Sequence, residues 1–230
     1  MILETEDQAR TWVASRPGVS RETMDRLDAL AAFVAEEARH QNLVSAATLA
    51  SMWQRHIADS AQLLRFAAPQ PDEHWVDLGS GAGFPGLVIA LLAPCRVTLI
   101  ESRGLRIAYL DKAIDRFGLR GRAEVAGSAL DKVESFAADY ISARAFAPLP
   151  RLLEGAGRFS TEKTRWLLPK GRNARAELES IAAAWQKLFH VEQSLTDADA
   201  AILVGTGRVA PIEARQAPRR KIERRHRSKR

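Results

Sequence analysis

The chain has 230 residues and a net charge of +6, with 46% hydrophobic and 27% charged residues. This length and composition suit one globular domain with a small appendage. No apolar run reaches the roughly 18 residues that span a bilayer, and the acidic start MILETEDQAR does not resemble a secretion signal. The single cysteine, Cys95, excludes an intrachain disulfide and a cysteine-based metal cluster. We therefore expect a cytoplasmic, monomeric protein without a metal or a membrane contact.

The positive charge is concentrated at the end of the chain. Residues 211–230 contain nine Lys or Arg and two Glu, a net of +7, whereas the preceding 210 residues carry 25 basic and 26 acidic groups. A basic tail on a near-neutral domain favours a polyanionic partner such as nucleic acid. A disordered, solubilising tail is the alternative, and composition gives it equal weight.

The first part of the chain, residues 1–68, is predicted to be a small helical extension packed on the core. Ser20 begins a stretch with apolar residues at helical spacing, and a second helix is predicted over about 47–66. Residues 40–46 are predicted to form the loop between them.

From His74 onward, short β-branched runs alternate with helical stretches, so residues 69–210 are predicted to form the main domain. The predicted strands are 74–78, 96–101, 123–126, 139–145, 165–170, 190–195 and 200–205. Helices fit between the strands, for example over 105–117 and 174–189. This alternation predicts an α/β fold with helices on both faces of a sheet, and the last two strands predict a final antiparallel hairpin.

The strongest local signal is the stretch WVDLGSGAGFPG, residues 75–86. A strand ends at Leu78, alternate glycines follow, and a helix is predicted to begin near Phe84, with Pro85 in its first turn. Glycines here allow a sharp turn and a close approach of a ligand to the backbone. A tight turn that binds nothing is the plainer alternative.

Two ligand classes use such a loop. Gly81, Gly83 and Gly86 satisfy the G-x-G-x-x-G dinucleotide fingerprint, which leaves an NAD(P)-dependent oxidoreductase as an alternative. Asp77 through Gly83 also form an acid-x-G-x-G-x-G pattern. An acid at the loop entrance repels a pyrophosphate but suits a sulfonium-bearing amino acid, so we favour S-adenosylmethionine (SAM).

Glu101 ends the second predicted strand, 22 residues after Gly79. A carboxylate at this position accepts hydrogen bonds from both ribose hydroxyls of a bound nucleoside. A solvated acid at a strand end is the alternative, but the adjacent glycine loop favours the ligand role.

Together these residues resemble the glucose-inhibited division protein B family, the 16S rRNA guanine-N7 methyltransferases, over about residues 40–172. The resemblance rests on NLVS and RHIADS (42–45 and 55–60), DLGSGAGFPGL (77–87), ES (101–102), ARAFAPL (143–149) and LPKG (168–171). It implies the class I SAM-dependent methyltransferase fold, which is Rossmann-like, with seven strands of which the last is antiparallel. The implied cofactor-site residues are Gly79, Phe84, Ala129, Leu130 and Arg144, and the implied substrate-site residues are His56, Asp59, Lys170 and Arg172.

Each implied residue also has a plainer interpretation. His56 and Asp59, three apart on a helix, could pair with each other. Arg144 could form a structural ion pair with Asp139 or Glu101. Ala129 and Leu130 also read as an ordinary helix start, and Lys170 and Arg172 as solvated charges at a strand end.

The acceptor chemistry is narrowed by which groups the sequence supplies. Methylation at C5 of a pyrimidine needs a thiolate, and Cys95 precedes the second strand, away from the ligand-binding end of the sheet. Exocyclic adenine amines commonly require an Asn/Asp-Pro-Pro-aromatic segment, which RAFAP does not supply. Guanine N7 carries a free lone pair and needs no general base, so we assign no catalytic residue.

The resemblance implies guanine 527, in the 530 loop of 16S rRNA, as the target and 16S rRNA or the 30S subunit as the partner. Such a base must be single-stranded or flipped out of its helix. The alternatives are a SAM methyltransferase acting on another RNA or on a small molecule, and a noncatalytic protein that binds RNA through its tail.

Overall fold

The structure is a computed structural model and describes residues 2–211. Within that range one sheet has the strand order β3-β2-β1-β4-β5-β7-β6. Its strands are β1 (His74–Leu78), β2 (Arg96–Glu101), β3 (Ala123–Gly127), β4 (Tyr140–Ala143), β5 (Arg165–Lys170), β6 (Phe189–Gln193) and β7 (Ala201–Thr206). Strands β1 to β5 are parallel, and β7 is antiparallel to both β5 and β6. The strand order reverses between β1 and β4, the point at which open α/β sheets bind ligands.

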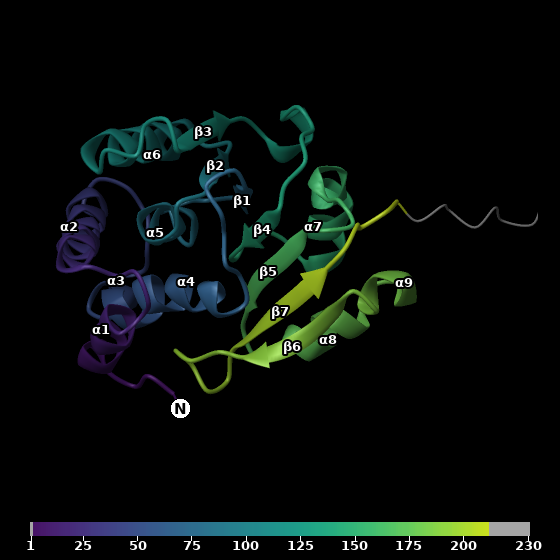
Figure 1. The fold of residues 1–230 in the computed structure, drawn as a ribbon, viewed down its shortest axis with the longest axis horizontal. Coiled ribbons are helices and arrows are strands. Elements are labelled where there is room, and N and C mark those ends of the chain that lie inside the picture. The colour runs from purple at the N-terminus through teal and green to yellow at the C-terminus, as the bar shows by residue number, and fades with distance from the viewer. Residues whose placement is uncertain (1, 212–230) are drawn as a thin grey trace, which may run out of the picture.

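The N-terminal helices lie with α5 and α6 on one face of the sheet (Figure 1). These elements are α1 (Glu6–Ala14), α2 (Arg21–Glu37), α3 (Ala46–Leu49), the π-helix η1 (Trp53–Ala58), α4 (Asp59–Ala61), the 3-10 helix η2 (Gln62–Arg65), α5 (Gly86–Leu92) and α6 (Gly104–Arg116). Phe33 of α2 stacks on Tyr109 of α6 with ring centroids 5.4 Å apart. Leu27, Leu30 and Trp75 are fully buried in the same core, so the extension and the sheet share one apolar interior.

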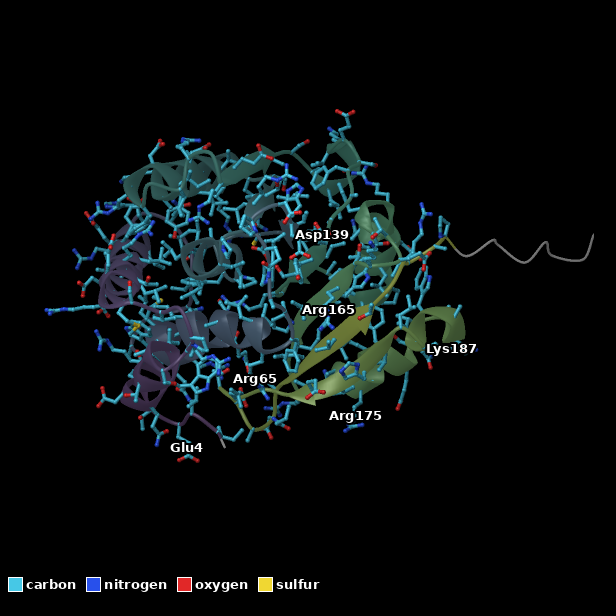
Figure 2. All side chains as sticks on the ribbon, viewed as in Figure 1. Glu4, Arg65, Asp139, Arg165, Arg175 and Lys187 are labelled. Atoms are coloured by element: carbon cyan, nitrogen blue, oxygen red, sulfur yellow. The ribbon has the colours of Figure 1, made fainter. Side chains whose placement is uncertain are left out.

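The second face of the sheet is covered by the later helices (Figure 1). They are η3 (Leu130–Lys132), α7 (Leu149–Ala156), η4 (Gly157–Phe159), α8 (Ala174–Glu179) and α9 (Ala183–Gln186). Val76 and Leu78 of β1 point to this core, whereas Trp75 points to the other, as the two-residue period of a strand requires. Side chains fill the space between the sheet and the helices on both faces (Figure 2).

The predicted seven-stranded sheet with an antiparallel last strand is confirmed. Strands β1, β2 and β5 begin and end at the predicted residues. The start of α2 is also as predicted, because the Ser20 side chain accepts a hydrogen bond from the backbone N–H of Thr23 (3.1 Å). None of the helices that the structure describes is both long and apolar enough to span a bilayer.

The prediction of one helix over 47–66 is wrong, because a tertiary contact interrupts it. The Glu6 carboxylate of α1 accepts hydrogen bonds from the backbone N–H groups of Trp53 (2.9 Å) and Gln54 (2.7 Å). These two donors open a new helical segment at η1, which is capped by a side chain from a distant part of the chain. The periodicity of the sequence contains no signal for this contact.

The predicted helix over 174–189 is also divided, into α8 and α9. The Gln186 side-chain amide donates to the backbone carbonyls of Glu179 (3.2 Å) and Ile181 (2.8 Å) across the interruption. Ile181 and Trp185 are both buried against the sheet. The Gln186 amide therefore satisfies backbone carbonyls at the break, while Ile181 and Trp185 remain packed in the core.

Candidate active site

The glycine loop after β1 follows a backbone path that glycine adopts without strain. Gly79, Gly81 and Gly83 have φ values of +66°, +56° and +87°, in the left-handed region. A Cβ added at Gly79 would overlap Cδ2 of Phe146, and one at Gly83 would overlap the Leu87 side chain. The first glycine therefore leaves room beside Phe146, and the third lets α5 pack against the loop.

Asp77 is completely buried and supports the loop from inside the sheet. Its Oδ2 accepts a hydrogen bond from the backbone N–H of Gly86 (3.2 Å), and its Oδ1 accepts one from the Ser142 hydroxyl (2.8 Å). Burial raises the pKa of the Asp77 carboxyl to about 6. In this geometry Asp77 ties α5 to β1 and β4, and its predicted contact with the cofactor stays a prediction.

Glu101 lies at the end of β2 and holds the loop from the other side. Its Oε2 accepts from the backbone N–H of Gly81 (3.0 Å), and its Oε1 accepts from those of Ser102 (2.8 Å) and Arg103 (2.9 Å). The Arg106 guanidinium lies 3.9 Å from Oε2. A carboxylate has about four acceptor positions, so the one that remains open to a ribose hydroxyl is on Oε2.

A cavity of about 190 Å³ opens at the carboxyl ends of β1 and β2. Of the predicted cofactor residues, Gly79, Glu101 and Leu130 line it. Ala129 lies between two lining residues, Ser128 and Leu130, and forms the N-cap of η3. The cavity is thus bounded by the loop, by the acid at the end of β2 and by the segment that follows β3.

Arg144 is the first residue after β4, and its guanidinium joins three groups of the N-terminal helices. Its Nη1 donates to the backbone carbonyl of Arg55 (3.0 Å) and lies 3.3 Å from Oδ2 of Asp59. Its Nη2 donates to Nδ1 of His56 (2.9 Å). Arg144 therefore connects the end of the sheet to η1 and α4, and its carboxylate partner is Asp59, not one of the two acids expected from the sequence.

His56 is buried and stacks on Phe84, with ring centroids 4.9 Å apart. Burial, Arg144 and Arg55 lower the pKa of His56 to about 3, so the ring is neutral. Because Nδ1 accepts from Arg144, the proton lies on Nε2, which has no hydrogen-bond partner among residues 2–211. Phe84 is 3% exposed and supports His56, and the His56–Asp59 pair considered from the sequence does not form.

The helix that carries these side chains is irregular. Residues 53–58 form a π-helix, a feature that recurs at functional sites. Asp59 follows at once, and its Oδ1 accepts hydrogen bonds from the Thr196 hydroxyl (2.8 Å) and the Gln62 amide (2.9 Å). The loop between β6 and β7 is thereby attached to the N-terminal helices.

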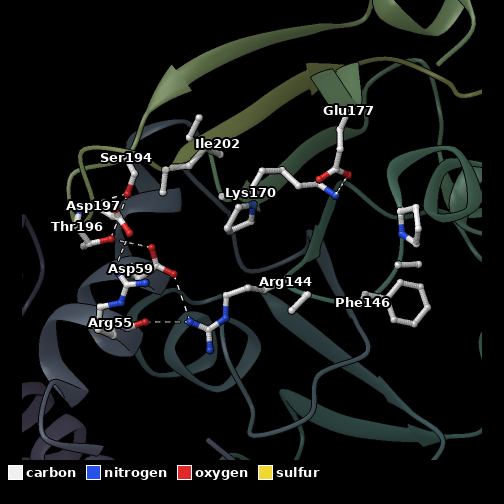
Figure 3. Close-up of a pocket in the computed structure, with 17 residues that line it drawn as sticks. Arg55, Asp59, Arg144, Phe146, Lys170, Glu177, Ser194, Thr196, Asp197 and Ile202 are labelled. Carbon is white, nitrogen blue, oxygen red and sulfur yellow. Dashed lines mark hydrogen bonds and ion pairs between the residues drawn. The ribbon is translucent and has the colours of Figure 1, made fainter. Parts of the chain in front are cut away.

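A larger cavity of about 650 Å³ opens beside this network (Figure 3). Figure 3 shows Asp59 and Thr196 on one side of it and Glu177 and Phe146 on the other. Its cationic side chains are each paired with a carboxylate: Arg55 with Asp197 (2.7 Å), Arg144 with Asp59 (3.3 Å) and Lys170 with Glu177 (2.8 Å). The charges on the wall are therefore close to balanced among apolar residues such as Phe146 and Ile202, and the volume falls in the range of small-molecule sites.

The two cations predicted at the end of β5 lie in different surroundings. Lys170 lines the larger cavity, and its side chain is 10% exposed. Arg172 is 79% exposed, lies 4.0 Å from Asp199 and does not line the cavity. The chain leaves the sheet after Lys170, so Arg172 points to solvent, and the predicted contacts of both residues with the substrate stay predictions.

Among the charged and aromatic residues that line the larger cavity, four were missed from the sequence: Arg55, Phe146, Glu177 and Asp197. Phe146 lies two residues after Arg144 in the ARAFAPL motif, and this position could have identified it as a site residue. Glu177 and Asp197 come from α8 and from the loop before β7, and nothing local marks them. Ion pairs that form across the fold bring them into the site.

Residues 23–203 match the GidB family, described as rRNA small subunit methyltransferase G. The chain is 50% identical over 208 residues to the ribosomal RNA small subunit methyltransferase G of Erythrobacter litoralis, across 90% of this chain and 99% of that protein. It is also 50% identical over 203 residues to the protein of the same name from Rhizorhabdus wittichii, across 88% and 93% of the two chains.

Two solved structures share the fold at low identity. One is a mutant of MtNAS in complex with S-adenosylmethionine (16% identity, TM-score 0.55, 88% of this chain and 77% of that one). The other is a SAM dependent methyltransferase from Aquifex aeolicus (15% identity, TM-score 0.51, 67% and 92%). They show the class I methyltransferase fold, and the sequence relatives show the family. The chain therefore belongs to the GidB family of methyltransferases that act on small-subunit ribosomal RNA.

Proposed function

We propose that the protein transfers a methyl group from SAM to N7 of a guanine in 16S rRNA. The observation that carries this proposal is the meeting of two cavities at the carboxyl edge of the sheet, where Ala145 and Phe146 line both. The smaller cavity suits a nucleoside and the larger one a flipped base. The family resemblance supports guanine 527, in the 530 loop, as the nucleotide.

The smaller cavity fits the cofactor. A Cβ at Gly79 would intrude beside Phe146, so the loop offers bare backbone at that point, and Glu101 Oε2 keeps one acceptor position for a ribose hydroxyl. Leu130 provides an apolar wall on which an adenine ring could lie. Gly81 and Gly83 act through the path of the loop, because their positive φ values bring Gly79 to the cavity.

Guanine N7 suits this site because its methylation needs no proton acceptor. When bound, SAM supplies a methyl group whose carbon–sulfur bond breaks as the N7–carbon bond forms, so positive charge passes to the purine and no proton leaves. The cavity carboxylates that the structure describes, Asp59, Glu177 and Asp197, are each held by a cation. The His56 Nδ1 lone pair is occupied by Arg144. These residues therefore orient and hold neighbouring groups, and we assign none as a base.

Other acceptors fit less well. Methylation at C5 of a pyrimidine needs a thiolate, and Cys95 is buried before β2, with burial raising the pKa of its thiol to about 11. The near-neutral wall of the larger cavity suits an uncharged base better than an anionic small molecule. Lys170, whose ammonium is tied to Glu177, lines this wall and fixes its far side.

We further propose that the substrate is 16S rRNA or the 30S subunit, met in the cytoplasm by a monomer of this chain. The target assignment is tested by chemical cleavage. Unmodified 30S subunits are treated with the protein and SAM, and the RNA is then reduced with borohydride and cleaved with aniline, which breaks RNA at 7-methylguanosine. We expect one enzyme-dependent break, in the 530 loop. An intact 530 loop after confirmed methyl transfer would overturn the assignment of this nucleotide.

A further inference from the structure

Phe146 stands at the junction of the two cavities. Among the residues that line either cavity, Phe146 and its neighbour Ala145 are the two that line both. The segment follows Arg144, whose guanidinium is fixed to His56 and Asp59. Any group that passes between a cofactor in the smaller cavity and an acceptor in the larger one must therefore pass this side chain.

The Phe146 ring is open to solvent at this junction. Its Cδ2–Cε2 edge faces Gly79, where an added Cβ would overlap it. Phe146 is 37% exposed, and among residues 2–211 the other exposed large apolar side chain is Leu105, at 74%. Because this half-exposed ring lies where the two cavities meet, its open surface is available to a flat ligand that enters either of them.

The backbone holds this ring in place. Ala145 has a φ of +51°, a conformation that residues other than glycine rarely adopt. Arg144 anchors the segment before it, and after it the backbone N–H of Leu149 donates to Glu177 Oε2 (3.2 Å). Strained backbone persists where anchored neighbours enforce it, and it is concentrated at binding sites.

We propose that Phe146 is the surface on which the acceptor base stacks during methyl transfer. This inference rests on the proposed function, since it assigns the residue that positions the guanine of that reaction. A base taken out of an RNA helix loses its stacking partners, and an aromatic side chain restores that contact. N7 transfer depends on alignment of the base, which a ring at the junction provides.

The contact with Gly79 raises a competing role, in which Phe146 only shapes the cofactor cavity. The two roles predict different losses. A stacking residue affects kcat/KM for RNA at saturating SAM, whereas a residue of the cofactor cavity affects the Kd for SAM. The variants are Phe146→Leu, which removes the ring and keeps an apolar side chain, and Phe146→Tyr, which keeps the ring.

The matched control is Phe136→Leu. Phe136 stacks on His74 at the opposite end of β1, with centroids 4.7 Å apart, and lines neither cavity. We expect Phe146→Leu to lower kcat/KM for 30S subunits by roughly 5- to 150-fold, the range that base–aromatic stacking gives. Phe146→Tyr should restore turnover, Phe136→Leu should retain it, and the Kd for SAM should change less than kcat/KM in Phe146→Leu. Equal turnover of Phe146→Leu and wild type, or a loss confined to SAM binding, would overturn the proposal.

An abasic substrate tests the contact itself. The wild-type protein first identifies the methylated guanosine, and subunits are then reconstituted with RNA that lacks the base at that position. Wild type should bind the abasic subunits more weakly than the intact ones, and Phe146→Leu should bind both equally. If the variant distinguishes the two substrates as strongly as wild type does, Phe146 is not the stacking surface. If wild type modifies no guanine, the proposed function fails first, and that failure is separate.

Discussion

Arg144 connects the end of β4 to three groups of the N-terminal helices. It is the first residue after β4, and it binds the Arg55 carbonyl, the Asp59 carboxylate and His56 Nδ1. A planar guanidinium with several donors makes such an arrangement possible, whereas an ammonium has one point of charge. We therefore regard Arg144 as the residue that holds the N-terminal helices over the carboxyl edge of the sheet.

Arg144→Lys keeps the positive charge and removes the planar guanidinium with its several hydrogen-bond donors. We expect kcat/KM to fall about 10- to 150-fold, because one or two charged hydrogen bonds of about 1.5–3 kcal/mol are lost or displaced. The Tm should fall by about 3–12 °C, because each kcal/mol lost lowers it by about 2–4 °C in a chain of this size. Steady-state kinetics and thermal melting measure the two effects.

Arg10→Lys is the matched control, because Arg10 pairs with Asp28 (2.7 Å) on the surface. Exposed pairs contribute at most about 1 kcal/mol, so this variant should keep both activity and Tm. A large drop in the Tm of Arg144→Lys, with normal specific activity of the folded protein, would make Arg144 a structural residue only.

His56 gives a prediction for the pH dependence of stability. Its pKa is lowered from 6.5 to about 3 in the folded protein, so the folded ring stays neutral while the unfolded chain takes up a proton below 6.5. Its contribution to the free energy of unfolding is thus complete above 6.5 and is lost as the pH falls toward 3. The loss approaches about 1.4 kcal/mol per pH unit in that window.

His56→Asn keeps an acceptor for Arg144 and does not titrate. Urea unfolding at several pH values should show wild type losing stability relative to His56→Asn between about pH 6 and pH 4, by up to about 1.4 kcal/mol per unit. Parallel profiles for the two proteins would show that His56 is protonated in the folded state or accessible to solvent.

For individual residues, the sequence predicted which side chains line the site better than it predicted their burial and their ion pairs. Gly79, Glu101, Leu130 and Lys170 line the cavities. Their positions could be predicted because strand ends and loop glycines are recognisable in the sequence. The burial of Asp77 was not predictable, since the partners that bury it come from β4 and α5. The same holds for the exposure of Arg172 and for the ion pairs of Glu177 and Asp197, which depend on how distant segments meet.

At the scale of elements, the glycine loop between β1 and α5 is fixed from both sides. Asp77 binds the N-terminus of α5 through Gly86, and Glu101 binds the middle of the loop through Gly81. The loop is therefore held before any ligand arrives, which lowers the entropic cost of binding.

Gly81→Val tests this loop, and Gly18→Val is its control. Both positions have positive φ, +56° and +80°, so valine costs backbone strain of roughly 1–2 kcal/mol at either. A Cβ at Gly81 lies 3.5 Å from the Arg106 guanidinium beside the cofactor cavity, whereas nothing lies within 4 Å at Gly18. We expect similar losses of Tm and a loss of SAM binding, by calorimetry, in Gly81→Val alone. Equal SAM affinity in both variants would place the cofactor elsewhere.

The strands were predicted more accurately than the helices, and the reason is physical. The β-strands are short apolar runs bounded by turns, and burial on both faces makes them distinct in the sequence. The helices over 47–66 and 174–189 have continuous helical periodicity, yet Glu6 and Gln186 supply hydrogen bonds that start or interrupt segments within them. Glu6 lies outside the segment that it caps, and Gln186 acts through its polar side chain, so neither contact is visible in the apolar period of the sequence.

At the scale of the whole molecule, the comparisons confirm the predicted methyltransferase family and the predicted cofactor. Membership of the GidB methyltransferase family and the class I fold confirm SAM as the cofactor, and they leave no support for the NAD(P)-dependent oxidoreductase considered for Gly81, Gly83 and Gly86. A Cβ at Gly86 would overlap Leu99 and crowd Asp77, so this glycine is required for packing of α5 on the sheet.

The net positive charge lies in residues 211–230 of the sequence. The first 210 residues carry 25 basic and 26 acidic groups, and the predicted basic tail, residues 211–230, falls outside the described residues except for Pro211. The cations of the larger cavity are neutralised by acids. We therefore predict that long-range attraction to RNA comes mainly from residues 211–230.

Truncation after Ala210 tests whether residues 211–230 supply the attraction to RNA. We expect weaker binding to 30S subunits and a flatter plot of log affinity against log salt, with each lost phosphate contact removing about 0.9 or less from the slope. The affinity for SAM should not change, because the loop and Glu101 are intact. Equal salt slopes for the truncated and full-length proteins would mean that the RNA contacts lie on the domain.

The central claim is that this site methylates guanine at N7 without removing a proton. It is tested most directly by incubating unmodified 30S subunits with the protein and methyl-labelled SAM, digesting the RNA to nucleosides and identifying the labelled product. The account predicts that the label is recovered as 7-methylguanosine, with one methyl group per 16S rRNA. Label in 5-methylcytidine, in N6-methyladenosine or in a ribose methyl group would contradict it.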